Sequence, residues 1–324
     1  MTVHQNHGVH RFALLVSGAT FFLVIAGASV TSTGSGLAVP DWPLSFGTLF
    51  PPMEGGVLYE HSHRMIAGAV LVLTIILNVW LFRREERPWV RNMGLVTLVL
   101  LVVQALLGGL TVLNRLPPAI SVSHAGLAVA VFGLTVSLAL VTSPGWREFS
   151  SRSETAGLAF PRGLALVTAC AIYLQIVLGA IVRHVGAGLA IPDFPLSFGR
   201  LFPPDLSAPI VLHYAHRVGA FVVSVCACLL IVRIVRNHRD EAMLRRLAVF
   251  LAGVLALQLM LGALTIWTRR AVVPTTAHVA FGAVTLALCL MLTLWLYRLQ
   301  PLRAARPVRL VNLAELTLNR THKP

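Results

Sequence analysis

Eight long apolar runs constrain the fold of this 324-residue chain more than any other feature. A helix needs roughly 20 apolar residues to cross the hydrocarbon core of a bilayer. Only 12% of the residues are charged, whereas soluble domains carry about 25%. The sequence therefore predicts an all-α integral membrane protein. Its eight transmembrane helices are expected at about 12–32, 63–82, 92–113, 119–142, 162–182, 210–235, 247–267 and 273–297.

The chain also contains an internal repeat. Residues 34–52 read GSGLAVPDWPLSFGTLFPP, and residues 186–204 read GAGLAIPDFPLSFGRLFPP. A second match joins QALLGGLT at 104–111 to QLMLGALT at 258–265. Each unit holds four spans, and an even number returns the chain to its starting side, so both units have the same orientation. We therefore expect two pseudo-symmetric, parallel four-helix bundles.

This repeat divides the chain into five parts. We predict an N-terminal segment at 1–11, an N-terminal four-helix repeat at 12–142, a polar linker at 143–161, a C-terminal four-helix repeat at 162–297 and a basic tail at 298–324. Each unit has one long outward loop, at about 33–62 and 183–212. Their Gly, Pro, Asp and aromatic residues are typical of a lid at the membrane interface.

The net charge of +14 is distributed unevenly across the predicted membrane. Of the 26 lysines and arginines, 19 fall on one side of the spans and seven on the other. Cytoplasmic loops carry an excess of such residues. We therefore expect a cytoplasmic-membrane protein with both termini in the cytoplasm. The charge indicates topology and attraction to anionic lipid rather than a nucleic-acid partner.

Four histidines form two equivalent pairs. His63 and His216 begin the second span of each unit, and His124 and His278 begin the fourth. These spans run in the same direction, so the imidazoles lie at one depth. A single buried histidine often bonds a neighbouring helix, but two matched pairs favour metal ligation. His61 and His184, in the outward loops, have no repeat partner and carry less weight.

Haem suits these pairs better than a bare metal ion. Zinc or copper requires further Cys, His or carboxylate ligands, whereas a porphyrin supplies four nitrogens itself. Arg64 and Arg217 each follow a histidine and have two interpretations: pairing with a haem propionate, or extension to lipid headgroups. Gly108 and Gly262 are interpreted as helix-packing residues.

The two units differ three residues before the first histidine of each pair, where Glu60 corresponds to His213. At this spacing each residue shares a helix face with its histidine. A carboxylate beside a haem accepts protons or stabilises a developing cation. Its alternative role is to complement the helix dipole. We assign chemistry to the first unit and electron transfer or support to the second.

Together, the duplicated eight-span pattern, the GSGLAxPDWPL loop, the Glu60-x-x-His63-Arg64 motif and the other three histidines resemble the haem A synthase family, CtaA. This resemblance, over residues 12–297, implies oxidation of a haem O methyl group to a formyl group by successive hydroxylations, for terminal oxidase biogenesis. It implies that Glu60 is catalytic, that His63 and His124 hold the substrate haem, and that His216 and His278 hold haem b.

The chain departs from the family pattern in one respect. Many bacterial members carry a cysteine pair in the first outward loop, where this chain has Val39 and Ser45. It therefore resembles the subtype without extracytoplasmic cysteines. The implied partners, besides haem O and lipid, are haem O synthase, terminal oxidase assembly factors and a second copy of the chain.

Two other functions share parts of this pattern. A non-enzymatic dihaem b-type cytochrome for electron transfer would need the same four histidines. A transporter with parallel repeats would share the duplication, but the paired histidines and the absence of Gly/Pro-broken helix centres count against it.

Overall fold

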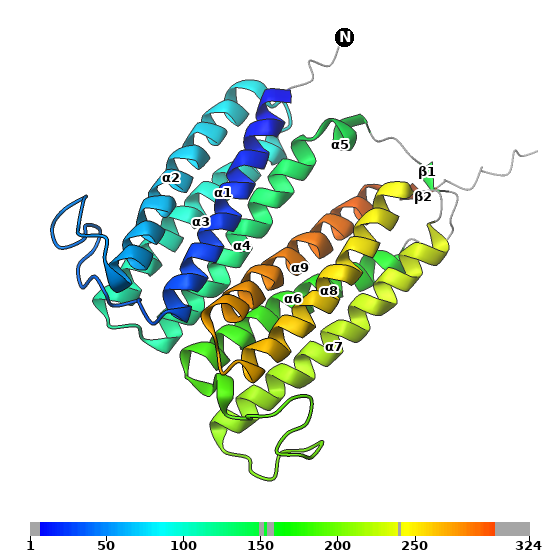
Figure 1. The fold of residues 1–324 in the computed structure, drawn as a ribbon. Helices are drawn as coiled ribbons and strands as arrows, with labels where there is room; N and C mark the ends of the chain where they lie inside the picture. Colours follow the sequence, from blue (N-terminus) through cyan, green and yellow to red (C-terminus); the bar gives the residue numbers. More distant parts are fainter. Residues whose placement is uncertain (1–6, 149–151, 154–158, 239–240, 302–324) are drawn as a thin grey trace, which may run out of the picture.

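A computed structural model describes residues 7–148, 152–153, 159–238 and 241–301. Within this part of the chain, eight helices are long and apolar enough to cross a membrane. They lie in two groups (Figure 1). The first group comprises α1 (His7–Ser32), α2 (Gly55–Arg84), α3 (Pro88–Leu113) and α4 (Pro118–Thr142); the second comprises α6 (Ala159–His184), α7 (Ala208–Asn237), α8 (Ala242–Trp267) and α9 (Val272–Arg298).

Three kinds of short element connect or end these helices. A single turn, α5 (Pro144–Glu148), follows α4, and a 3₁₀ turn, η1 (Ala187–Leu189), lies in the second long loop. Strand β1 (Arg152–Ser153) pairs in parallel with β2 (Gln300–Pro301). The predicted all-helical membrane fold is thus confirmed. Most of the predicted N-terminal segment and basic tail lies outside the described residues.

Several helices begin earlier than the apolar runs predicted. Helix α2 begins at Gly55 instead of about 63, and α7 begins at Ala208 instead of about 210. The long loops are correspondingly shorter, at 33–54 and 185–207. The prediction was wrong here because polar residues such as Tyr59 and Glu60 end an apolar run without ending a helix. A helix satisfies its own backbone hydrogen bonds whatever its side chains are.

Local sequence explains several helix ends. Proline lies in the first turn of α3, α4 and α7, where its missing N–H costs nothing. Arginines lie in the last turn of α2, α7 and α9, where they complement the helix dipole.

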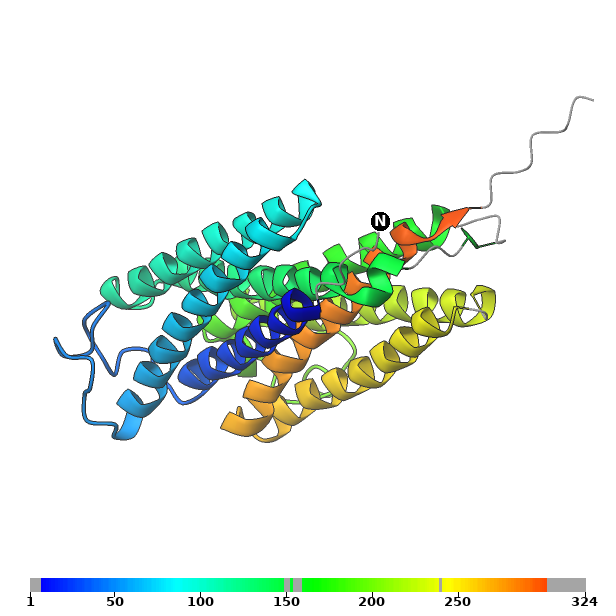
Figure 2. The same ribbon diagram turned by 90° about the horizontal axis from the view of Figure 1, so that it is seen from above.

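Each group of four closes into a ring of contacts. In the first group α1 contacts α2 and α4, and α3 contacts the same two helices; in the second, α6 and α8 each contact α7 and α9. The groups meet through α4 against α9, α1 against α9, and α4 against α6. Figure 2 shows the same arrangement from above.

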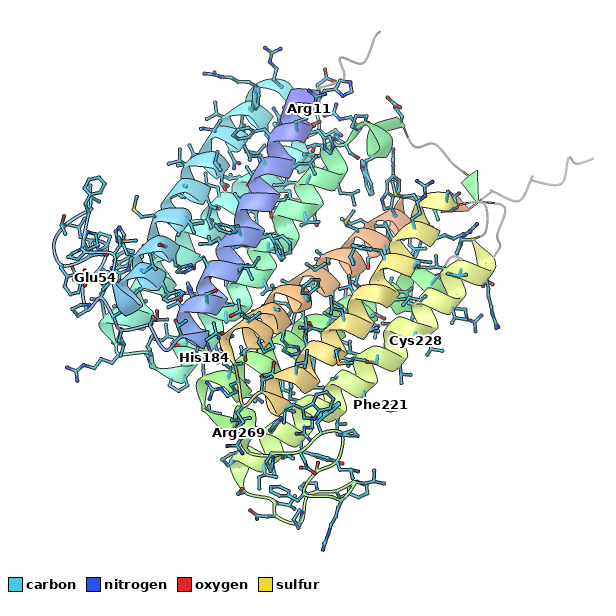
Figure 3. The ribbon with its side chains drawn as sticks, in the orientation of Figure 1. Arg11, Glu54, His184, Phe221, Cys228 and Arg269 are labelled. Atoms are coloured by element: carbon cyan, nitrogen blue, oxygen red, sulfur yellow. The ribbon has the colours of Figure 1, made fainter. Side chains whose placement is uncertain are left out.

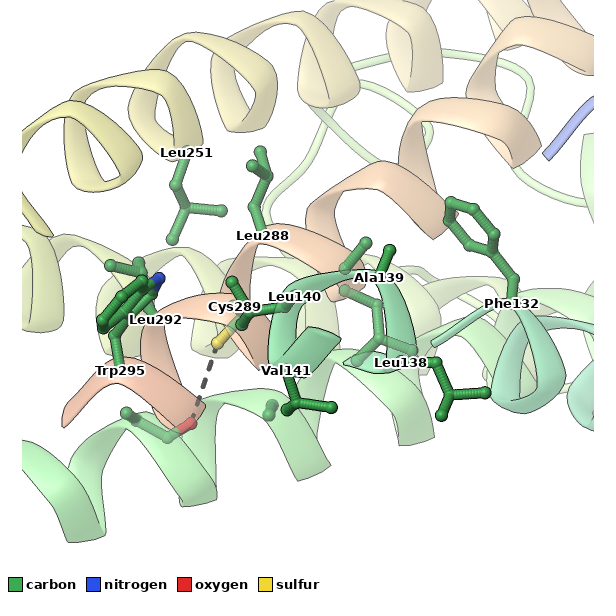
Figure 4. Packing of buried hydrophobic residues seen from close by; sticks show 14 of the residues in the cluster. Phe132, Leu138, Ala139, Leu140, Val141, Leu251, Leu288, Cys289, Leu292 and Trp295 are labelled. Carbon is green, nitrogen blue, oxygen red and sulfur yellow. Dashed lines mark hydrogen bonds between the residues drawn. The ribbon is translucent and has the colours of Figure 1, made fainter. Parts of the chain in front are cut away.

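The hydrophobic core continues from one group into the other. Helices α4 and α9 are the most buried of the eight. Phe132 and Leu138 on α4 belong to the same buried cluster as Leu288 and Leu292 on α9 (Figure 4). The cluster includes Cys289, whose thiol donates to the Ala165 carbonyl at 3.7 Å. The cysteine therefore serves as a buried packing residue.

Candidate functional site

The four paired histidines occupy matching positions in their helices. His63 lies eight residues after the first residue of α2, and His216 lies eight after that of α7. His124 and His278 each lie six residues after the start of α4 and α9. They are thus two turns inside the helices, rather than at their first residues. Both long loops lie at this same end of the molecule (Figure 1).

His216 and His278 face each other across the second group. Their ring centroids are 6.5 Å apart, and their planes are inclined by 81°. With metal–nitrogen bonds of about 2.0 Å and ring radii of about 1.1 Å, two imidazoles sharing one metal have centroids roughly 6.2 Å apart. The spacing therefore fits one haem iron between the rings.

Backbone carbonyls orient the second histidine of each pair. His124 Nδ1 lies 3.2 Å from the Gln104 carbonyl oxygen, and His278 Nδ1 lies 3.2 Å from that of Gln258. A metal-ligating histidine usually donates its other ring N–H to such an acceptor. Gln104 Nε2 also donates to the His124 carbonyl at 2.9 Å and lies 3.4 Å from His124 Nε2.

Glu60 is buried and fixed between the first loop and its own helix, with a relative exposure of 3%. Its Oε2 accepts a hydrogen bond from the Val39 backbone N–H at 2.9 Å, and its Oε1 pairs with Arg64 at 2.5 Å. Arg64 also donates to the carbonyl oxygens of Asp41 and Leu44. The carboxylate thus has one defined orientation, and Arg64 fixes the loop over the helix.

The second half repeats these contacts with a different residue at the centre. His213 is equally buried, and its Nδ1 accepts from the Ile191 backbone N–H at 3.2 Å. Arg217 donates to the carbonyl oxygens of Ile191, Asp193 and Leu196. Glu60 and His213 therefore perform the same structural task, and they differ in the chemistry they bring.

An aspartate shapes each loop beneath these contacts. Asp41 accepts from the backbone N–H groups of Phe46 and Gly47, at 2.7 and 2.8 Å. Asp193 accepts from Phe198 and Gly199 at the same distances. In both loops, these hydrogen bonds lower the aspartate pKa, and the bond from the glycine N–H has a larger effect than the bond from the phenylalanine N–H. The two loops are therefore preformed in the same way.

Two histidines expected in the loops lie in helices. His61 is buried in α2, and its Nδ1 lies 2.8 Å from Ser45 Oγ. His184 is the last residue of α6, and Figure 3 shows it near the junction of the two groups. The neighbouring Arg183 crosses this junction and donates to the Ala28 carbonyl and the Ser32 hydroxyl on α1.

Gln175 was not among the predicted site residues. Its Nε2 lies 2.9 Å from His216 Nδ1 and 2.7 Å from the His216 carbonyl oxygen. An amide at helix mid-length in a bilayer was the signal that could have identified it, because such groups need partners. Among the described residues, no group of three or more His, Cys, Asp or Glu could hold a bare metal ion. A porphyrin supplies four nitrogens to its iron, so the two imidazoles of a histidine pair would provide the ligands that a haem still needs.

Comparisons of the sequence with known proteins identify relatives of this chain. Residues 56–290 match the COX15-CtaA model, described as cytochrome oxidase assembly protein. The haem A synthase of Shouchella clausii is 29% identical over 74% of this chain and 80% of its own length. That of Listeria welshimeri is 30% identical over 79% and 85%, and that of Symbiobacterium thermophilum is 30% identical over 78% and 84%.

Proposed function

Because this chain belongs to the COX15-CtaA family of cytochrome oxidase assembly proteins, we propose that its two halves divide the work of a haem A synthase, the oxidoreductase that converts haem O to haem A. The N-terminal half binds the substrate haem O between His63 and His124. The C-terminal half binds a resident haem b between His216 and His278, whose ring separation fits one iron.

One observation carries this division of labour. Glu60 and His213 occupy the same place, each accepting a backbone N–H from the loop above it. Only the first half therefore presents a carboxylate three residues before its histidine. Since the loop contact is common to both halves, loop support alone does not explain the glutamate. We assign Glu60 as the catalytic carboxylate.

The chain's own residues hold this carboxylate ready. Val39 and Arg64 fix its two oxygens, so it does not rotate freely when substrate binds. A carboxylate in this position accepts a proton or stabilises positive charge that develops on the substrate. Bound haem O supplies the methyl group that successive hydroxylations convert to a formyl group, and haem b supplies a redox-active iron.

Arg64 and Arg217 hold the two long loops over their helices. Each guanidinium binds several loop carbonyls, which holds the loop in place and limits access of water. Arg217 Nε is buried and has no partner among the described residues. We propose that this remaining donor pairs with a propionate of haem b, and that Arg64 has the corresponding role toward haem O.

The proposed topology follows from the same duplication. If the two halves are exchanged, α1 takes the place of α6 and α9 takes the place of α4. The contact of α1 with α9 then becomes the contact of α6 with α4, and both contacts are present, which supports two pseudo-symmetric four-helix bundles. In this topology both termini lie in the cytoplasm, and 19 of the 26 lysines and arginines lie on the cytoplasmic side. The cysteine-free first loop supports membership of the subtype without an extracytoplasmic thiol pair. Haem O synthase, oxidase assembly factors and a second copy are the proposed partners.

Pigment analysis tests this function. The full chain is expressed with a haem O supplier, purified in detergent and extracted for haem. We expect haem A or haem O together with haem B, and formation of haem A that depends on Glu60. Haem B alone, with no haem A formed in the cells, would instead indicate a dihaem b-type cytochrome.

A further inference from the structure

Each of the four paired histidines packs against a glycine on the preceding helix. A Cβ added at Gly27, Gly108, Gly179 or Gly262 would lie 2.8–3.1 Å from the Cε1 of the facing imidazole. Such contacts are tighter than side chains normally make, so a larger residue at any of these positions would require the ring to shift, most of all at Gly179. The contacts pair Gly27 with His63, Gly108 with His124, Gly179 with His216 and Gly262 with His278.

In three of these contacts, a glutamine precedes the glycine by four residues, one turn earlier on the same helix. The segments are Gln104–Gly108, Gln175–Gly179 and Gln258–Gly262. Each glutamine reaches its histidine, through the side-chain amide of Gln175 or through the backbone carbonyls of Gln104 and Gln258. Among these three, only Gln175 contacts Nδ1 with its side chain, whereas Gln104 and Gln258 use a main-chain carbonyl that any residue could supply. We call this arrangement the imidazole socket: a glycine under the ring and, one turn earlier, a residue bonded to Nδ1.

The socket of His63 lacks both the glutamine and the bond to Nδ1. Leu23 stands four residues before Gly27, at the repeat position of Gln175. His63 Nδ1 is buried and has no hydrogen-bond partner among the described residues. Buried polar atoms are nearly always paired, so this atom requires an explanation. Leu23 itself packs beside a small apolar cluster of Val70, Leu101 and Val131.

The missing partner affects how strongly the imidazole binds a metal. A hydrogen bond from the second ring nitrogen fixes the ring orientation and raises ligand basicity, and its removal typically weakens metal binding 10–100-fold. When His216 ligates iron through Nε2, its Nδ1 carries a proton, and the Gln175 amide can turn to present its oxygen. His63 has no such group, and a substrate haem must leave after each reaction.

We propose that Gln175 and Leu23 set the residence time of haem in the two halves. Gln175 secures His216 for a resident haem, whereas Leu23 leaves His63 as a weak, exchangeable ligand that releases the product. Both are positioning residues that act through a histidine. This inference rests on the proposed function, because it assigns release to the half that binds haem O.

The test measures haem release from the full-length protein, loaded with haem B in both halves and mixed with excess apomyoglobin. We expect a fast phase from the N-terminal half and a slow phase from the C-terminal half. His124→Ala, which removes a ligand of the N-terminal half, identifies the fast phase by abolishing it. Leu23→Gln should slow the fast phase about 10–100-fold, and Gln175→Met should accelerate the slow phase similarly.

Leu23→Met is the matched control, because it changes the side chain at the same position without adding an amide. It should leave both phases unchanged. Gln175→Met should also shift the redox midpoint potential of the C-terminal haem, which a purely structural role would not require. The proposal is overturned if Gln175→Met changes neither release nor potential, or if Leu23→Met slows release as much as Leu23→Gln.

Failure of the proposed function gives a different result. A wild-type protein that binds haem only at His216 and His278 contradicts the substrate site in the N-terminal half and the exchange role of Leu23. The Gln175→Met measurement still tests the socket there, because it concerns the resident haem alone.

Discussion

The Glu60 Oε2 and the Val39 backbone nitrogen are 2.9 Å apart, and this hydrogen bond joins α2 to the loop that covers it. The second half makes the equivalent bond between His213 and Ile191. A contact present in both halves is a requirement of the fold. The charge at Glu60 is present in one half only, so it is the feature to test as a requirement of the chemistry.

Glu60→Gln separates these two roles. The amide oxygen of glutamine still accepts the Val39 N–H, while the ion pair with Arg64 and the ability to take a proton are lost. We expect haem O to bind and the rate of haem A formation to fall about 10²–10⁴-fold, the usual contribution of an acid–base group. Haem extraction and chromatography measure both quantities.

His213→Gln is the matched control for that variant. It retains an acceptor for the Ile191 N–H, and it should change haem A formation by no more than a few-fold. Equal loss of haem A in both variants would show that the position supports the loop and carries no chemistry.

Gly179→Ala should displace His216. The added Cβ would lie 2.8 Å from the imidazole Cε1, and overpacking of this kind destabilises a folded protein by about 1–3 kcal/mol. We expect weaker retention of haem b and an altered Soret band in the purified protein. Gly18→Ala on α1 is the control, because its added Cβ would have no atom within 4 Å apart from the neighbouring backbone of its own helix. Similar haem loss in both variants would contradict the contact.

The aspartate turns should respond to acid. Backbone N–H groups of Gly47 and then Phe46 lower the Asp41 pKa below its ordinary 3.8. A group with a lowered folded pKa stabilises the fold above its ordinary pKa, and this stabilisation is lost as the pH falls through the lowered value. The first loop should therefore be intact at pH 7 and loosen only below about pH 4.

Hydrogen exchange measures this effect. In Asp41→Asn, the Phe46 and Gly47 amides should exchange several-fold faster than in wild type at neutral pH. The difference should shrink as the wild-type carboxylate becomes protonated. Asp193→Asn should reproduce the result at Phe198 and Gly199. Equal protection of these amides in wild type and variant at neutral pH would rule out the role of the aspartate.

Sequence patterns predicted the larger features because these depend on composition and repetition. The apolar runs located all eight spanning helices, and the repeat identified the equivalent histidines. The runs misplaced the start of α2, so His61 was assigned to a loop although it is buried in a helix. Hydrophobicity reports where a segment can contact lipid, whereas helix ends depend on local backbone bonding.

The finer parts of the site depend on which helix faces meet, and no single sequence specifies this. Gly108 and Gly262 were interpreted as helix-packing residues, but each lies against a paired histidine. Gln175 lacked a counterpart in the first half, so the repeat comparison passed over it. The asymmetry at Leu23 becomes significant only once His63 and His216 are seen against equivalent glycines.

The repeat also contains a compensating pair of residues that yields a further prediction. Gly109 lies against Trp42, and a Cβ added there would lie 2.5 Å from the indole Cδ2. The second half has Ala263 and Phe194 at the equivalent positions, a larger residue opposite a smaller ring. Gly109→Ala should therefore lower stability by about 1–3 kcal/mol, and adding Trp42→Phe should restore most of it. Thermal unfolding of the two single variants and the double variant gives the coupling free energy between the two positions, which we expect at about 0.5–3 kcal/mol. Strictly additive effects would show that the indole and the glycine do not constrain each other.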